Sequence, residues 1–429
     1  MKETAAWIIN RHPEWGNELA ELLVKRLNTP KLNAAERDEL SAQFARFSTT
    51  PTIQKLLAEH LQDADATAEL QTIILRALAQ SRLKKVPESW TNGLARVLVT
   101  GKDDVLREAV AACRALPIPR GSANLRAELL AIGRDEKRAG ADMRLQALAA
   151  IPEGLSEIDA PLLAFLTANL DRERALAART LAAEILARSR LDSEQLIALA
   201  AHFKKTGPME ISRLLDAFTQ SADDKVGKAL LAGLAATPAR SSLRPEMVKP
   251  HLKKYSPAVQ KEAQKLYTLL DVNAEKQRAR LEELLSGLKG GDIRRGQAVF
   301  NSSKNACVAC HTIGYLGGKV GPDLTRIGQI RTERDLLEAI VFPSSSFVRG
   351  YEPVVIRTKS GKSHNGVIRQ DSTKTEIVLA TGVNQEVRIP RSEIDDIRPS
   401  QVSVMPSGLD QQLTPRELAD LVAFLKACR

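Results

Sequence analysis

The chain has 429 residues, a net charge of +10 at pH 7 and only 4% aromatic residues, and its length is sufficient for several domains. No apolar run reaches the roughly 18 residues of a membrane-spanning helix, so the sequence predicts a protein that is not transmembrane. Positive and negative residues are interleaved without a block of Lys and Arg, which excludes the clustered cations of a nucleic-acid-binding surface. A mildly basic surface suits an acidic protein partner instead.

Residues 1–289 carry the pattern of successive α-helices. Apolar residues recur at every third or fourth position, Ala is abundant, and short turns rich in Gly, Pro, Asp and Ser separate the segments. Four similar helical segments, irregularly spaced, begin at Asp103, Asp171, Asp223 and Ser256. The pattern is typical of stacked helix pairs and resembles degenerate HEAT-type repeats, which form an α-solenoid. One irregular α-helical domain is the alternative.

A break in this helical pattern predicts the main domain boundary. The helix that ends near Leu288 is followed by Lys289-Gly290-Gly291, and Asp292 then caps a new helix. We therefore expect a helical repeat domain over residues 1–289 and a second domain over residues 290–429.

The second domain combines helices with a short β region. Thr332 and Thr414 each begin a helix, the latter through a capping box with Glu417. Between them, residues 351–399 change to alternating apolar and polar positions, which predicts an insertion that forms a small β-barrel or sheet of four or five strands. The apolar runs of this insertion are residues 354–356, 366–368, 377–379 and 387–389. The predicted fold is therefore mainly α.

The most specific motif is Cys307-Val308-Ala309-Cys310-His311. Two thiols three residues apart on one turn can reach the two vinyl groups of a haem, and the next residue then presents its imidazole to the iron. The motif predicts one covalently bound haem c, with its iron, held by Cys307, Cys310 and His311.

Two other interpretations of the cysteine pair are weaker. A structural zinc site needs two further ligands, and the sequence contains no second cysteine pair. A thioredoxin-like dithiol needs a βαβ context, whereas this motif lies between a predicted helix and the Gly-rich loop 314–322. Cys113 lies in an apolar helical run and is expected in a core.

Elimination leaves two candidates for the second axial ligand of the iron. After Cys310 the sequence contains one methionine, Met405, and one histidine besides His311, namely His364. Met405 lies in a turn-rich segment before the last helix, where a loop can fold over the haem, whereas His364 falls beside a turn of the β region. We predict His311 and Met405 as the metal ligands, with His364 as the alternative. A thioether ligand raises the potential and leaves no open coordination position, which favours electron transfer over substrate chemistry.

These residues and their surroundings resemble class I cytochrome c. The matching residues are Gly296, Phe300, Cys307, Cys310, His311, Gly321, Pro322, Met405, Leu421 and Phe424. The resemblance implies that the first and last helices of the domain cross at a Gly/aromatic contact. It also implies that the Pro322 carbonyl accepts the Nδ1–H of His311 and fixes its orientation, which makes Pro322 part of the haem site.

Residues 292–429, about a third of the chain, resemble more closely the haem-binding domain described from planctomycete- and verrucomicrobium-type bacteria. The matching segments are residues 321–325, 343–345, 351, 405–409 and 417–421. In that family the domain often ends a larger protein, with a β-propeller dehydrogenase upstream and helical repeats between. This chain contains no propeller, so the resemblance assigns it no catalytic residue. The β insertion between His311 and Met405 is a departure from simple cytochromes c.

The expected function is the transfer of single electrons from an upstream dehydrogenase domain or a partner redox protein to a downstream acceptor. The helical repeats would act as a docking scaffold, and the chain would be an electron-transfer module rather than a catalyst. One alternative is a haem-dependent, peroxidase-like enzyme in which Met405 is displaced. The other is a repeat scaffold that carries a haem-based redox sensor.

The motif also predicts a location, because haem c is normally attached after export. We expect a periplasmic or otherwise extracytoplasmic protein. Residues 1–4 lack the features of a secretory signal, so we expect a mature form or a piece of a longer protein.

Overall fold

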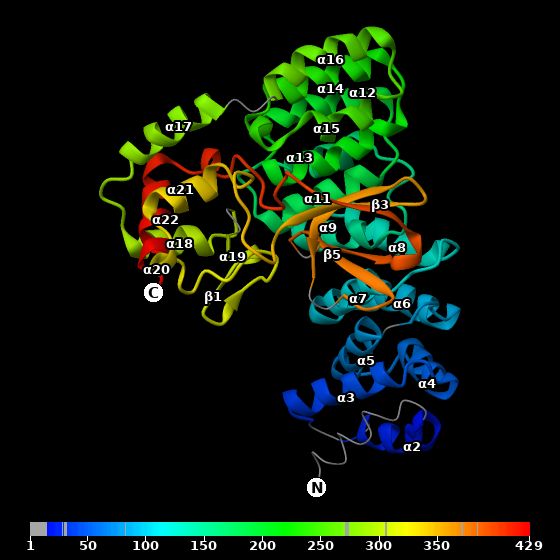
Figure 1. Ribbon diagram of the computed structural model, residues 1–429. Helices are drawn as coiled ribbons and strands as arrows, with labels where there is room; N and C mark the ends of the chain where they lie inside the picture. Colours follow the sequence, from blue (N-terminus) through cyan, green and yellow to red (C-terminus); the bar gives the residue numbers. More distant parts are fainter. Residues whose placement is uncertain are drawn as a thin grey trace. The chain divides into compact units, whose positions relative to one another are not determined.

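The computed structural model describes residues 15–27, 29, 32–81, 83–270, 274–304, 307–369, 372–383 and 385–429. Within these residues the protein is mainly helical, with 21 α-helices and 60% helix, and it contains a small antiparallel sheet region (Figure 1). None of the described helices is both long enough and apolar enough to cross a membrane. Residues 1–4, on which the expectation of a mature form or a piece of a longer protein rests, lie outside the described residues.

The chain divides into two compact units, one of residues 1–162 and 184–190 and the other of residues 163–183 and 191–429. The helices of the first unit are α2 (Gly16–Leu27), α3 (Ala34–Arg46), α4 (Pro51–Gln62), α5 (Ala68–Gln80), α6 (Glu88–Thr100), α7 (Asp103–Ala115), α8 (Ala123–Arg134) and α9 (Ala141–Ala150). Two helices, α10 (Ala160–Ala168) and α11 (Leu176–Arg188), contribute residues to both units.

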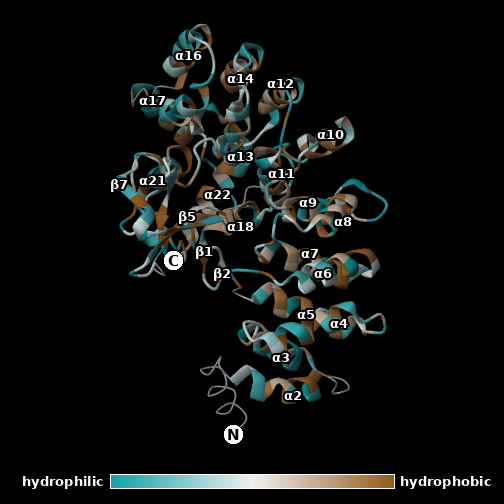
Figure 2. Cartoon of the chain, turned by 90° about the vertical axis from the view of Figure 1, so that its right-hand side faces the viewer, coloured by the Kyte–Doolittle hydropathy of each residue, from teal (hydrophilic) through white to brown (hydrophobic). Residues whose placement is uncertain are grey.

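The helices of the first unit pack in two rows. Helices α3, α5, α7 and α9 pack on one another in turn, and so do α4, α6 and α8 (Figure 2). Each helix buries an apolar face between the rows, as the spacing of its apolar residues predicts. Trp90 on α6 is fully buried, and its Nε1–H donates to the Gln54 carbonyl of α4 at 2.9 Å. Cys113 on α7 is buried in the core, as predicted.

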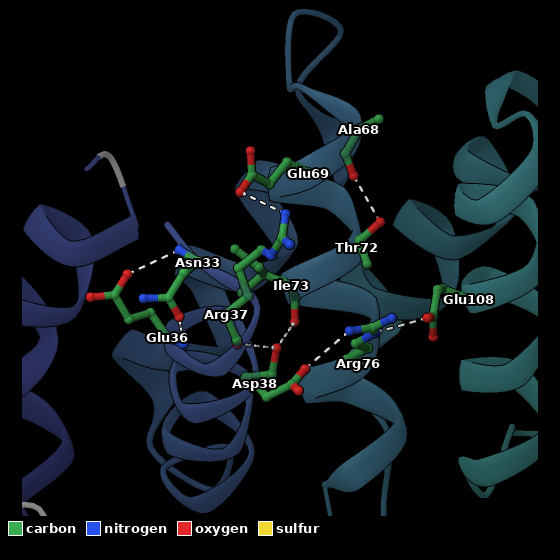
Figure 3. A network of polar contacts seen from close by, with 11 residues as sticks. Asn33, Glu36, Arg37, Asp38, Ala68, Glu69, Thr72, Ile73, Arg76 and Glu108 are labelled. Carbon is green, nitrogen blue, oxygen red and sulfur yellow. Dashed lines mark hydrogen bonds and ion pairs between the residues drawn. The ribbon is translucent and has the colours of Figure 1, made fainter. Parts of the chain in front are cut away.

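Polar contacts link successive helices of the first row (Figure 3). Arg37 on α3 pairs with Glu69 on α5 at 3.1 Å, and Arg76 on α5 pairs with Glu108 on α7 at 2.8 Å. Each of these pairs spans 32 residues. The pairs are partly exposed, so each of them contributes little stability.

The second unit contains further helices before the predicted domain boundary. They are α12 (Ser193–His202), α13 (Pro208–Leu214), α14 (Asp224–Ala236), α15 (Pro245–Val248), α16 (Pro257–Leu270) and α17 (Ala274–Ser286), with the 3₁₀ turns η2 (Phe203–Lys205), η3 (Leu215–Gln220), η4 (Pro238–Ser242) and η5 (Lys249–Leu252). Helices α12, α14 and α16 again pack in turn. Tyr255 donates its hydroxyl to the Phe218 carbonyl at 2.9 Å, which ties the turn before α16 to η3.

One predicted helix start is wrong. The segment expected to begin a helix at Asp171 does not become helical until Leu176, where α11 begins. Asp171 forms an isolated β-bridge with Thr206, and the Arg172 N–H donates to the Lys205 carbonyl at 2.9 Å. The backbone groups of this segment are satisfied by tertiary partners instead of by the first turn of a helix.

Residues 292–429 form the remaining elements of the second unit. The helices are α18 (Ile293–Asn301), α19 (Cys307–Cys310), α20 (Ile327–Ile330), α21 (Glu333–Val341) and α22 (Pro415–Ala427), the strands are β1 (Thr312–Ile313), β2 (Leu316–Gly317), β3 (Pro353–Thr358), β4 (Ser363–Ile368), β5 (Glu376–Gly382), β6 (Gln385–Pro390) and β7 (Ile394–Pro399), and the 3₁₀ turns are η6 (Arg391–Glu393) and η7 (Asp410–Gln412). The predicted caps are confirmed: Asp292, Thr332 and Thr414 cap α18, α21 and α22. The boundary expected between residues 289 and 290 falls between α17 and α18, inside the second unit, and stays a prediction.

The β insertion is a five-stranded antiparallel sheet with the strand order β6-β5-β4-β3-β7. Its order is linear, with β6 and β7 at the edges, so the described strands form a sheet and not a barrel. Ile356, Ile377, Leu379 and Ile389 form its core. Strand β7 was not among the predicted apolar runs, because charged residues dominate the sequence of this edge strand.

Replacement of Trp90 by Ala is expected to lower the free energy of unfolding by about 3–5 kcal/mol, because it leaves a cavity between α4 and α6. Chemical denaturation followed by circular dichroism measures the effect. Val99 lies on the same helix and is 57% exposed, so Val99→Ala is the matched control and should change stability by less than about 0.5 kcal/mol. Equal effects of the two substitutions would contradict the packing described for α6.

Candidate functional site

The site is built on the crossing of α18 and α22. Gly296 on α18 lies against the Asp420 carbonyl of α22, and a Cβ atom at position 296 would also lie 2.6 Å from Cβ of Phe424. The Phe300 and Phe424 rings pack at a centroid distance of 5.7 Å, tilted by 54°. The helices can approach this closely only because residue 296 has no side chain. The Gly/aromatic crossing expected from the class I cytochrome c resemblance is therefore present.

A buried carboxylate joins the start of α18 to the middle of α22. Asp420 accepts from Nε of Arg295 at 2.7 Å, from Nη2 of Arg295 at 2.9 Å and from the Asp292 N–H at 2.7 Å. The hydrogen bonds from the Arg295 guanidinium, followed by the Asp292 backbone bond, hold the pKa of Asp420 below its usual value. The side chain of Asp420 is 2% exposed and that of Arg295 is 50% exposed, so solvent screens part of this ion pair.

The cysteine motif forms a single helical turn whose backbone is held by the loop that follows it. Within α19 and the next residue, the His311 N–H donates to the Cys307 carbonyl at 2.9 Å. The segment predicted as a Gly-rich loop, residues 314–322, contains strand β2, which pairs with β1 just before it, and the loop returns to the motif. The Gly318 N–H donates to the Val308 carbonyl at 2.8 Å, and the Gly321 N–H donates to the Cys310 carbonyl at 2.9 Å. These bonds fix the orientation of the two cysteines and the histidine.

His311 has one ring nitrogen committed to the backbone. Its Nδ1 lies 2.8 Å from the Pro322 carbonyl oxygen, which can only accept, so Nδ1 carries the proton. A Cβ atom at Gly321 would lie 2.5 Å from Cε1 of the ring, so the imidazole packs directly on this glycine. Burial lowers the pKa of His311, while the hydrogen bond to Pro322 opposes the change. The lowered pKa favours the neutral imidazole, and with Nδ1 protonated its Nε2 has a lone pair for a ligand.

The two thiols of the motif are not bonded to each other. Burial raises the pKa of Cys307 to about 12 and that of Cys310 to about 11. Dithiol oxidoreductases need the opposite, a thiolate with a lowered pKa. The environment of the pair argues against thioredoxin-like chemistry.

A cavity opens beside the motif, with a volume of about 480 Å³ including its mouth. Cys307, His311 and Met405 line it together. The rest of its wall is apolar and comes from α18, α21, α22 and two loops: Phe300, Leu324, Ile340, Leu409, Leu413, Leu421 and Leu425. An apolar wall with a few ligating side chains is typical of the sites that bind organic cofactors.

Met405 reaches the cavity on a loop that the β insertion and α21 support. The Met405 N–H donates to Oγ of Ser403 at 3.1 Å, and the Ser403 N–H donates to Oγ of Ser344, which follows α21, at 3.0 Å. Asn365 of β4 donates its amide to the Val402 carbonyl at 3.3 Å. The alternative ligand, His364, lies on β4 opposite Ile356 and is not among the residues that line the cavity.

Sequence reasoning missed the residues that hold this loop and part of the cavity wall. Ser344 lies in the matching segment 343–345 but no role was predicted for it, and Asn365 carries no recognisable motif. Only the fold brings Ser344 to Ser403 and Asn365 to Val402. Leu409 and Leu413 could have been found, because apolar residues in a turn-rich segment beside a proposed ligand indicate a buried loop.

Among the described residues, no group of three or more His, Cys, Asp or Glu side chains could hold a metal ion. Comparison with known proteins adds no family assignment: no model of a known protein family matches the chain, and a search of curated proteins finds no similar one.

Replacement of Asp420 by Asn is expected to make the melting temperature depend less on pH in the acid range. The folded pKa of Asp420 lies below the roughly 3.9 of an unfolded Asp, so its ion pair stabilises the fold above that pH. This contribution is lost as the pH falls through the lower folded pKa. We expect Asp420→Asn to lower the melting temperature at pH 7 and to reduce its decline between about pH 5 and pH 2.5.

Thermal unfolding monitored by circular dichroism across this pH range measures both effects. Glu262 is exposed on α16, so Glu262→Gln is the matched control and should keep the wild-type profile. An unchanged slope in Asp420→Asn would show that Asp420 does not stabilise the crossing through its charge.

Proposed function

We propose that the chain carries one covalently bound haem c at Cys307, Cys310 and His311, with Met405 as the second axial ligand, and that it transfers single electrons. The observation that carries this proposal is the apolar cavity that Cys307, His311 and Met405 line together. The four-nitrogen ring of a haem needs only axial ligands from the protein, so a cluster of acidic or further histidine ligands is not required. When bound, the haem supplies a reversible one-electron Fe(III)/Fe(II) couple.

The residues present fit this group in three respects. The Cys307 and Cys310 thiols are free to form thioether bonds with the two vinyl groups. The Pro322 carbonyl fixes the ring of His311 and leaves Nε2 for the iron, as outer partners of metal-bound histidines commonly do. Met405 contributes a thioether to the same cavity.

The wall of the cavity also suits a carrier. Its Leu, Ile and Phe side chains exclude water and lower the local dielectric constant, and both effects disfavour the more highly charged ferric state. With two protein ligands on the iron, no coordination position is left for a substrate. We therefore propose an electron carrier rather than an enzyme.

The wider proposal is a class I cytochrome c domain, of the kind described from planctomycete- and verrucomicrobium-type bacteria, preceded by a HEAT-like α-solenoid. It is supported by the α18–α22 crossing at Gly296, the Pro322 contact and the alternating packing of α3 to α9. In this proposal the solenoid is a docking scaffold for an upstream dehydrogenase or a redox partner protein. Because haem c is attached after export, the location we propose is the periplasm or another extracytoplasmic compartment.

Expression in a periplasm with a c-type haem maturation system tests the proposal. We expect a covalently bound haem that survives denaturation, and a reduced-minus-oxidised spectrum of low-spin iron. Cys307→Ala with Cys310→Ala should abolish attachment. Absence of covalent haem in the wild-type chain, or a five-coordinate iron, would contradict the carrier function.

Replacement of Met405 by Leu is expected to lower the midpoint potential by about 0.1 V or more, because axial ligands tune haem potentials over a range of about 0.8 V. Spectroelectrochemical titration measures the shift. Met143 lies on α9 in the first unit, so Met143→Leu is the matched control and should keep the wild-type potential. A Met405→Leu variant with an unchanged potential would exclude Met405 as a ligand. If the wild-type protein turned over peroxide as fast as the Met405→Leu variant, the protein would be an enzyme and not a carrier.

A further inference from the structure

A buried arginine contacts both of the chain segments that carry the haem ligands of the proposed site. Arg179 lies in the first half of α11 and is 1% exposed. Its Nη2 donates to the Lys304 carbonyl at 3.0 Å, and its Nη1 donates to Oε1 of Gln412 at 3.3 Å. Lys304 lies three residues before Cys307, and Gln412 lies seven residues after Met405. These contacts cross 125 and 233 residues of sequence.

Other contacts fix the same neighbourhood. The Leu176 N–H at the start of α11 donates to the Ser303 carbonyl at 2.8 Å, and Nζ of Lys304 donates to Glu173 at 2.6 Å. Gln412 belongs to η7, and its neighbours Leu409 and Leu413 line the cavity. Gln412 therefore lies in the part of the chain after Met405 that supplies two residues of the cavity wall.

The charge of Arg179 is balanced by one carboxylate. Glu210 on α13 is also 1% exposed, and its Oε1 lies 3.6 Å from Nε of Arg179. This distance is too long for a hydrogen bond, and among the described residues Nε of Arg179, both carboxylate oxygens of Glu210 and Nε2 of Gln412 have no hydrogen-bond partner. Burial raises the pKa of Glu210, while the charge of Arg179 opposes the change.

A buried pair such as Arg179 and Glu210 is a weak source of stability by itself. Two apolar residues of the same size would fill the space without the cost of desolvating two charges and the three polar atoms of the pair that have no hydrogen-bond partner. What apolar residues could not supply is a planar group of donors that reaches two carbonyl-type oxygens on separate segments at once. The geometry of the donors, and not the burial of charge, is the feature that needs an arginine here.

We propose that Arg179, with its charge balanced by Glu210, is a positioning residue that holds the segment before Cys307 and the segment after Met405 in the relative position that closes the haem cavity. This inference rests on the proposed function for its consequence, but its structural part concerns contacts of the chain itself. Loss of Arg179 should loosen both segments together, although they are more than 100 residues apart in sequence.

Hydrogen exchange measured by mass spectrometry tests the structural part in the full chain, with and without haem. In Arg179→Met we expect exchange to be about tenfold faster or more in peptides 298–304 and 407–413, because the hydrogen bonds that anchor both segments are lost. Arg179→Lys keeps the charge but not the planar donors, so it should rescue these rates only in part. Arg174→Met is the matched control, since Arg174 is exposed just before α11, and it should exchange like the wild type.

A double variant separates positioning from the penalty of an unpaired buried charge. Arg179→Met leaves Glu210 without its partner, and Arg179→Met with Glu210→Gln removes both charges. We expect the double variant to recover the wild-type melting temperature and yet to keep the fast exchange of both peptides. Recovery of slow exchange in the double variant, or wild-type exchange in Arg179→Met, would overturn the proposal.

The haem readout is separate from these measurements. In matured protein, Arg179→Met and the double variant should both show less methionine-ligated low-spin iron and a shifted midpoint potential, which a merely structural role would not cause once the melting temperature is recovered. A wild-type potential in the double variant would overturn the role of Arg179 at the site. Absence of covalent haem in the wild-type chain would defeat the proposed function, while the exchange experiment would still decide whether Arg179 holds the two segments.

Discussion

The close approach of α18 and α22 is the contact on which the candidate site depends. These helices meet where Gly296 allows backbone contact, and the Phe300 and Phe424 rings pack beside that point. The same two helices supply Phe300, Leu421 and Leu425 to the cavity wall. A larger side chain at position 296 would push the helices apart and open the wall, because packed cores do not absorb an added side chain without displacement. The buried Asp420, bonded to both Arg295 and the start of α18, fixes the crossing in register.

Beside the crossing of α18 and α22, contacts from separate parts of the chain hold the ligating side chains. The hairpin after the motif returns to it through the bonds from Gly318 and Gly321, and Pro322 then fixes the His311 ring. Met405 follows the β insertion in sequence and lies on a loop that Ser344 and Asn365 hold in place. The insertion is thus part of the site, because its strand β4 anchors the loop that carries Met405. Ordered support of this kind keeps a ligand near its bound geometry before the cofactor arrives.

The helical part of the second unit takes part in the same arrangement. Arg179 on α11 contacts the chain at Lys304, before Cys307, and at Gln412, after Met405. A helical scaffold that only displayed a separate domain would not need a buried charge at this point. The proposed electron carrier is therefore built from residues of both predicted domains, even though its ligands all come from residues 290–429.

The sequence by itself determined the local features. It predicted the mainly helical fold, the caps at Asp292, Thr332 and Thr414, and the insertion of strands, because caps, periodicity and turn residues act over a few neighbouring positions. It also singled out Cys307, Cys310 and His311, since their chemistry depends on adjacent positions on one turn. The sequence did not predict strand β7, because this strand is rich in charged residues. It also did not predict the late start of α11, because tertiary backbone contacts outweigh the local helical preference there.

Only the tertiary structure decided which distant residues meet. It brought Met405, and not His364, to the cavity with His311, although the sequence contains both as candidates. It also revealed the hydrogen bonds of Arg179 to Lys304 and Gln412, which lie 125 and 233 residues away and follow no motif. Contacts of this kind depend on how whole helices and loops pack, and the pattern of any single segment contains no information about them.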